Sequence, residues 1–168
     1  MPNTAHSPAQ RWYLLAAVVV LLDQLSKWAI VASFSRGEVL PVTGYFNLLL
    51  TYNEGAAFSF LAAAGGWQRW ALSTLALVLS AVLVVWISRA AKRWQEALPL
   101  ALILGGALGN VIDRLRIGAV VDFLDLHYGG YHWPAFNVAD MAISAGAIII
   151  LLSLIFDKES RKGRGGRI

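Results

Sequence analysis

The sequence predicts an all-α membrane protein with four transmembrane helices and a small outward-facing β-cradle in its first outer loop. Its 168 residues are 58% hydrophobic and 14% charged, whereas a typical soluble domain has about 25% charged residues. The mean hydropathy is +0.60. A chain of this length has little room for a second domain, so we expect residues 1–168 to form a single membrane domain.

Four apolar stretches supply the expected helices, since a helix needs about 20 residues to cross a bilayer. We expect spans over residues 12–34, 67–87, 97–116 and 139–157. The apolar part of the third, residues 97–112, would reach only about 24 Å at 1.5 Å per residue, so that helix must extend by a turn or lie in a locally thinned bilayer. In the first, residues 12–22 have the length of a signal-peptide core. Asp23 and Lys27 follow at once and no cleavage site is clear, which favours a retained helix.

The basic residues predict how these helices are oriented. If both termini lie on one side, nine of the 14 Lys and Arg fall there: Arg11, Arg89, Lys92, Arg93, Lys158, Arg161, Lys162, Arg164 and Arg167. Four fall on the other side: Arg36, Arg69, Arg114 and Arg116. Because cytoplasmic segments are rich in Lys and Arg, we expect cytoplasmic termini and outer loops over residues 35–66 and 117–138. Residues 158–168 would form a basic cytoplasmic tail drawn to lipid headgroups.

The first outer loop has the composition of a β-structure at the membrane surface. Residues 39–42 and 45–52 are rich in β-branched, aliphatic and aromatic residues, and Pro41 and the Thr43-Gly44 step punctuate them. Such runs, bounded by turn residues, predict short strands or a hairpin. We expect this hairpin to form the cradle.

The first span holds a charged pair. Asp23 and Lys27 are four residues apart, so they share a helix face and can pair. The pair could merely orient the helix at the membrane surface. Gln24 and Ser26 add polar groups beside it. They favour a pair that faces the interior of the bundle, since charges within a membrane rarely face lipid.

Small residues accompany polar ones in the segment 52–59. Gly55 and Ala56 would let the backbone approach a neighbour closely, and Asn53 offers both donors and acceptors. An ordinary turn explains the same residues equally well.

The end of the third span repeats this combination. Gly105 and Gly109 form a small-xxx-small pattern that suits close helix packing. Asn110, Asp113 and Arg114 follow. A helix cap with an Arg reaching the surface would account for them, but Asn110 lies too deep for a cap. We therefore expect a polar cluster over the outer edge of the membrane.

Asp122 and Asp140 are the candidates for chemistry. Asp122 lies within the apolar run 120–124, and Asp140 follows Asn137 at the start of the fourth stretch. Two carboxylates in one site can share a proton, one acting as base and the other as acid, and such a pair activates water for peptide hydrolysis. Alternatively, Asp140 could cap a helix and Asp122 could be a surface acid, a role that suits Asp125 better.

Other chemistries fit less well. The chain has no cysteine, which excludes disulfides, thiol nucleophiles and Cys-based metal sites. His127, His132 and Asp125 lack a tight metal-ligand spacing, and no Gly-x-Ser-x-Gly or phosphate-binding Gly-Lys-Ser/Thr motif occurs. We expect no metal and no cofactor. The net charge of +4 is not gathered in one run, so we expect no nucleic-acid partner.

Together these motifs resemble the lipoprotein signal peptidases (signal peptidase II) of bacteria, over nearly the whole chain. Five segments carry the resemblance, in the family's order: Asp-Gln-Leu-Ser-Lys (23–27), Tyr-Asn-Glu-Gly-Ala-Ala-Phe-Ser (52–59), Gly-Asn-Val-Ile-Asp-Arg (109–114), Val-Val-Asp-Phe (120–123) and Pro-Ala-Phe-Asn-Val-Ala-Asp (134–140). No motif position departs from the family's pattern. Family members have a four-helix bundle with an outward β-cradle.

The resemblance implies an aspartyl endopeptidase of the inner membrane. Such an enzyme removes signal peptides from prolipoproteins already carrying diacylglycerol and cuts just before the modified Cys. Its catalytic pair would be Asp122 and Asp140. The other matched residues would support the site: Asp23, Lys27, Asn53, Gly55, Ala56, Asn110, Asp113, Arg114 and Asn137. Lipid-modified prolipoproteins and membrane lipid would be its partners. It would act as a monomer, with its site near the outer face.

Two other classes of function compete with this one. Asp23, Lys27 and Asp140 could form the proton relay of a small ion-coupled transporter, which predicts polar residues at the bilayer midplane and internal repeats. No repeat is visible. A non-catalytic membrane subunit predicts that charge-neutral changes of the aspartates are harmless.

Overall fold

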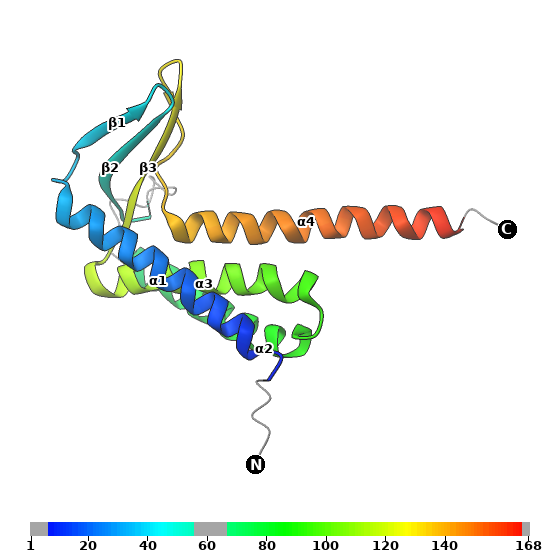
Figure 1. Ribbon diagram of the computed structural model, residues 1–168. Coiled ribbons are helices and arrows are strands. Elements are labelled where there is room, and N and C mark those ends of the chain that lie inside the picture. The colour runs from blue at the N-terminus through cyan, green and yellow to red at the C-terminus, as the bar shows by residue number, and fades with distance from the viewer. Residues whose placement is uncertain (1–6, 56–66, 166–168) are drawn as a thin grey trace, which may run out of the picture.

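The structure, a computed structural model, describes residues 7–55 and 67–165, with side chains up to residue 156. This part of the chain folds into helices and a small sheet (Figure 1). The helices are α1 (Gln10–Ser33), α2 (Trp67–Ala90), α3 (Trp94–Ile117) and α4 (Val138–Gly165). The strands are β1 (Val39–Thr43), β2 (Phe46–Asn53), β3 (Val120–Tyr128) and β4 (Tyr131–His132).

All four helices are long and apolar enough to cross a bilayer, which confirms the prediction of four spans. The third helix gains length at both ends, since it begins at Trp94 and includes Asp113 and Arg114 in its last turns. It ends where Gly118 adopts a left-handed conformation with φ 81°, which glycine tolerates without strain. The polar residues after the apolar stretch therefore lie on helix, not in a loop.

The central helix of the bundle is α3. In its most apolar window 56% of the residues are buried, against 17–22% in the other three helices, so those helices leave most of their surface to lipid. Glycines allow the close packing. A methyl group on Gly105 would lie 2.7 Å from Val19 Cβ of α1, and one on Gly109 would lie 2.6 Å from Asp23 Oδ2. Gly106 similarly faces a backbone carbonyl of α4.

The sheet corrects the prediction that the β-structure belongs to the first loop alone. Its strands run antiparallel in the order β1-β2-β3-β4, and β3 and β4 come from the second loop, residues 117–138. The sequence does not show β3 as a strand because its first four residues are all buried, so the alternation of a half-exposed strand is missing. The segment 128–131 is a loop tip as expected, with Gly129 and Gly130 at positive φ.

The sheet stands at one end of the bundle (Figure 1). Ile30 of α1 packs with Leu50 of β2 and with Val121 and Phe123 of β3, and this apolar cluster joins the sheet to the helices. The first turn of α1 and the far end of α4 both point away from the sheet. The two long loops thus meet at the same end.

Candidate active site

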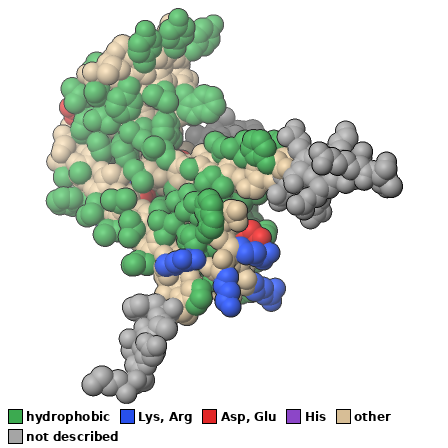
Figure 2. Space-filling view, turned by 45° about the vertical axis from the view of Figure 1, so that its right-hand side comes forward, with side chains coloured by type: hydrophobic (Ala, Val, Ile, Leu, Met, Phe, Trp, Pro, Cys, Tyr) green, Lys and Arg blue, Asp and Glu red, His purple; other side chains and the backbone are tan. Residues whose placement is uncertain are grey.

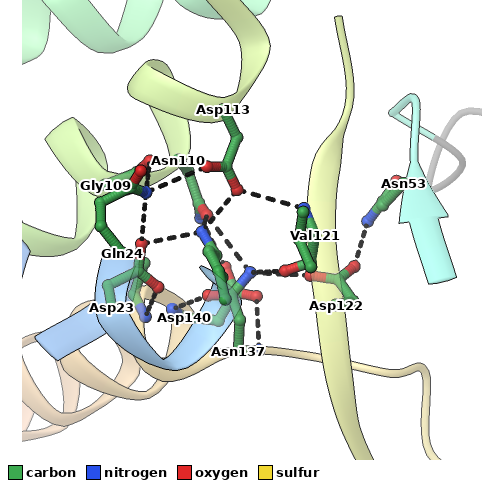
Figure 3. A network of polar contacts seen from close by, with 12 residues as sticks. Asp23, Gln24, Asn53, Gly109, Asn110, Asp113, Val121, Asp122, Asn137 and Asp140 are labelled. Carbon is green, nitrogen blue, oxygen red and sulfur yellow. Dashed lines mark hydrogen bonds and ion pairs between the residues drawn. The ribbon is translucent and has the colours of Figure 1, made fainter. Parts of the chain in front are cut away.

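The two candidate aspartates meet where the sheet joins the bundle. Asp122 lies on β3, opposite Thr51 of β2, and Asp140 lies in the first turn of α4. The chain between them folds back along β3. Phe136 and Leu124 exchange backbone hydrogen bonds of 2.9 and 3.0 Å, which direct the start of α4 toward Asp122 (Figure 3). The structure therefore brings both residues into one site.

Asn137 links the two carboxylates. Its side-chain amide donates to Asp122 Oδ1 at 2.7 Å, and its backbone N–H donates to Asp140 Oδ2 at 3.3 Å. In return, Asn137 Oδ1 accepts from the backbone N–H of Asp140 at 3.0 Å. This reciprocal arrangement is a capping box. The interpretation of Asp140 as the helix cap is wrong, because the fully buried Asn137 fills that position.

Asp122 is a buried acid and not a surface one, since only 2% of it is exposed. The Asn53 amide donates to its Oδ2 at 3.0 Å. Burial and, to a smaller extent, the charge of Asp140 raise the pKa of Asp122 to about 6, although the hydrogen bonds from Asn53 and Asn137 act the other way. This carboxyl can therefore hold or release a proton near neutral pH.

Asn110 connects Asp140 to a buried charge cluster on α1 and α3. Its amide donates to Asp140 Oδ1 at 2.8 Å, and its Oδ1 accepts from Lys27 Nζ at 3.0 Å. Lys27 Nζ also lies 2.8 Å from an oxygen of Asp23 and 2.8 Å from one of Asp113. These three acceptor oxygens match the three N–H donors of the Lys27 ammonium. Lys27 is only 3% exposed. The pair of Asp23 and Lys27 thus faces the interior of the bundle.

Each of the two supporting aspartates also holds the backbone just before a candidate catalytic one. Asp113 Oδ2 accepts from the N–H of Val121 at 3.1 Å. Asp23 Oδ1 accepts from the N–H of Ala139 at 2.9 Å. Gln24, whose amide lies 3.1 Å from Asp23 Oδ2 and 3.0 Å from Asp113 Oδ1, ties the two together (Figure 3). The cluster sets the positions of β3 and α4 relative to each other.

Two further candidates lie beside this network. The half-buried Arg114 lies close enough for the charges of Asp140, Asp122 and Asp113 to act on its guanidinium. Within the described residues its guanidinium forms no hydrogen bond or ion pair. Gly55, at φ +102°, donates its N–H to Asn53 Oδ1 at 2.9 Å. The turn at 53–55 therefore orients the amide that reaches Asp122.

Ala56 lies outside the described residues, so its predicted role stays a prediction.

The burial of one more acid, Asp125, was not anticipated. Asp125 is 4% exposed, so the interpretation of it as a surface acid is wrong. Asn47 lies opposite it in the register and donates to Asp125 Oδ2 at 2.7 Å, and His132 Nδ1 lies 2.9 Å from Asp125 Oδ1. Burial opposes the charged form, but the hydrogen bonds from His132 and Asn47 outweigh it and lower the pKa of Asp125. Only the strand register could have revealed this pairing, since Asn47 and Asp125 lie in different loops.

The sequence of the chain is similar to a known protein family. The family described as Signal peptidase (SPase) II matches residues 15–156. The lipoprotein signal peptidase of Ralstonia nicotianae is 58% identical over 142 residues, which cover 84% of this chain and 82% of that protein. The lipoprotein signal peptidase of Paraburkholderia phytofirmans is 49% identical over 165 residues, which cover 98% of this chain and 93% of that protein.

Solved structures show the same fold. Two of them, each described as a bacterial membrane enzyme studied by the in meso method, superpose with TM-scores of 0.79 and 0.78 at 30% and 31% identity. The first covers 90% of this chain and 91% of that chain, and the second covers 86% and 92%.

Proposed function

The chain belongs to the signal peptidase II family, and we propose that Asp122 and Asp140 are the catalytic pair of this multi-pass membrane peptidase. The observation that carries the proposal is the bridge through Asn137, which donates one hydrogen bond to each carboxylate. Because the chain belongs to a peptidase family, a peptidase function is favoured over the two alternatives, an ion-coupled transporter and a non-catalytic membrane subunit.

The pair would share one proton, and the two aspartates would have different roles. We assign the proton to Asp122, because burial raises its pKa to about 6. We assign the base to Asp140, whose two oxygens accept hydrogen bonds from Asn110 and Asn137. Asp140 takes a proton from water as the water oxygen attacks the scissile carbonyl, and Asp122 donates its proton to the carbonyl oxygen.

The tetrahedral intermediate would then collapse with the proton flow reversed. Asp140 gives its proton to the leaving nitrogen as the C–N bond breaks, and Asp122 recovers a proton from a hydroxyl of the intermediate. No proton is lost over the cycle, so the pair needs no cofactor. The positive charge of Arg114, beside both aspartates, would stabilise the carboxylate of Asp140 and the developing oxyanion.

The proposed substrates are prolipoproteins whose lipobox Cys carries diacylglycerol, cleaved just before that Cys. The names of the relatives support a lipoprotein substrate. We further propose an inner-membrane location with both termini in the cytoplasm and the site near the outer face. The basic residues support this orientation, because Arg89 in the last turn of α2 and Lys92 and Arg93 just before α3 lie at the end of the bundle away from the sheet. The protein would act as a monomer.

Cleavage of a purified diacylglyceryl-modified prolipoprotein tests the catalytic assignment. Asp122→Asn and Asp140→Asn should each reduce kcat by about 10²- to 10⁴-fold, the usual contribution of a positioned acid or base, while substrate binding persists. Asp125→Asn is the matched control, because it changes another buried aspartate on the same strand. It should retain turnover. Normal turnover in either of the first two variants would remove that residue from the chemistry.

A further inference from the structure

A groove opens on the surface of α2 and the turn into α3, at the end of the bundle away from the sheet. It has a volume of about 660 Å³ and is lined by Ala81, Val82, Val85, Trp86, Arg89 and Arg93. None of these residues takes part in the aspartate site. The lining combines an apolar floor with two guanidinium groups at one end.

The floor of the groove faces lipid. In α2 the buried positions Ser80 and Ile87 lie on the side of the helix that packs on α3. Val82, Val85 and Trp86 lie on other sides and are 54%, 49% and 51% exposed. In a helix that spans a membrane, such exposed apolar side chains contact acyl chains. A Trp one turn from a helix end is typical of the interface between lipid tails and headgroups.

Arg89 and Arg93 lie at the end of the α2 span, where we expect lipid headgroups. Arg89 is exposed in the last turn of α2, and within the described residues it has no hydrogen-bond or ion-pair partner. Arg93 uses NH1 for an exposed ion pair with Glu96 at 2.8 Å, which leaves its other N–H groups available. Arg11, near the same end, is engaged differently, since its guanidinium donates to the Ala91 carbonyl and lies over the Trp12 ring. Figure 2 shows Lys and Arg side chains gathered at the end where α1 begins.

We propose that this groove binds one anionic glycerophospholipid of the adjacent leaflet. The phosphodiester lies between Arg89 and Arg93, and an acyl chain follows Val82, Val85 and Trp86. Guanidinium groups match phosphate oxygens in charge and geometry. A zwitterionic headgroup would bring its own cation against two guanidiniums, and free phosphate would leave the apolar floor unused. Basic pockets at this depth of a membrane protein suit anionic headgroups. The site does not depend on the peptidase mechanism.

The test is lipid binding by the purified full chain in detergent, counted by native mass spectrometry and followed by the melting temperature. Phosphatidylglycerol should bind saturably and raise the melting temperature. Phosphatidylcholine with the same acyl chains should not compete. Glycerophosphoglycerol, the headgroup without tails, should bind far more weakly. Equal binding of phosphatidylcholine, or full binding by the headgroup alone, would overturn the proposal.

Variants locate the site. Arg89→Gln and Arg93→Gln should each weaken phosphatidylglycerol binding about fivefold, as expected for one basic residue at a membrane surface. Lys92→Gln is the matched control, because it removes the same charge from the same turn but does not line the groove. Its binding should stay within about twofold of wild type. Val85→Trp, which fills the floor without changing charge, should also weaken binding.

The controls make the outcome decisive. The side chains of Val85, Arg89, Lys92 and Arg93 are all exposed. The variants should therefore have the melting temperature of wild type when no lipid is present. If Lys92→Gln weakens binding as much as Arg89→Gln does, the attraction is diffuse and no defined site exists. If Val85→Trp leaves binding unchanged, the acyl chain does not occupy the groove.

Discussion

Two buried aspartates on one strand behave in opposite ways. Asp122 and Asp125 lie three residues apart on β3 and are 2% and 4% exposed. Each accepts a 2.7 Å hydrogen bond from a buried asparagine amide, Asn137 for the first and Asn47 for the second. Yet the pKa of Asp122 rises to about 6, whereas the pKa of Asp125 is lowered.

The difference lies in burial and in the groups beside each carboxyl. Burial is the largest cause that raises the pKa of Asp122, whereas the hydrogen bonds from His132 and Asn47 together lower the pKa of Asp125. Asp122 faces another carboxylate, Asp140, and Asp125 faces the imidazole of His132. Residues three apart on a regular strand point to opposite faces, so each aspartate belongs to a different environment. Burial alone therefore does not single out a carboxyl for acid-base chemistry. A second carboxylate beside it supports the proposed role of Asp122, because a pair can hold one proton more readily than none.

The largest expected effect comes from removing the basic side chain that contacts each group of buried aspartates. Lys27→Met leaves Asp23 and Asp113 buried without their shared cation, and should lower the free energy of unfolding by about 3–5 kcal/mol. His132→Phe removes the half-exposed partner of Asp125, where water can replace the ring, and should cost about 1 kcal/mol or less. Unfolding in mixed detergent micelles measures both. Equal losses would mean that Lys27 and His132 contribute equally to stability, which would contradict this expectation.

The two asparagines sharpen the comparison. Asn137→Ala removes both the bridge between the two proposed catalytic aspartates and the N-terminal cap of α4, so kcat should fall about 100-fold. Asn47→Ala removes an equally short hydrogen bond from Asp125, and should leave kcat within about twofold while lowering stability by about 1–3 kcal/mol. Peptide cleavage and melting temperature, measured on the same preparations, separate the two effects. Equal losses of kcat would show that Asn137 matters only for folding.

The third comparison concerns the pH dependence of stability. A raised pKa means that folding favours protonated Asp122, so this group's stabilisation is present below pH 3.8, its ordinary pKa, and lost as pH rises through about 6. The free energy of unfolding of Asp122→Asn should therefore exceed that of wild type by about 1–3 kcal/mol at pH 7. At pH 4 the two proteins should be about equally stable. Asp125, whose pKa is lowered, stabilises the fold above its ordinary pKa, so Asp125→Asn should melt lower at pH 7.

The same proton governs turnover. Loss of the proton from Asp122 removes the acid, so the rate of cleavage should fall as pH rises well above 6. A rate that stayed constant from pH 6 to 9 would contradict the assignment of Asp122 as the acid.

The local sequence was sufficient to predict the four helices and to identify most of the polar residues that meet in the site. Spans are recognisable because about 20 apolar residues in a row signal a bilayer whatever their neighbours are. The pairing of Asp23 with Lys27 followed from helical spacing. The second half of the sheet was missed because β3 is buried on both faces over most of its length. Gly106 was missed because only its contact with α4 distinguishes it from its neighbours.

The sequence by itself determined a four-span membrane protein and a short list of intramembrane and loop acids. The local residues alone do not separate Asp122 from Asp125, because the segment Val-Asp-Phe-Leu-Asp-Leu places both in nearly the same local surroundings; the resemblance to a family favoured Asp122. The tertiary structure shows how the surroundings of the two aspartates differ. Phe136 pairs with Leu124 and brings Asp140 beside Asp122, while the register of β2 brings Asn47 to Asp125. The protonation of a buried acid depends on the charges and hydrogen-bond donors within a few ångströms, and here those groups come from distant parts of the chain.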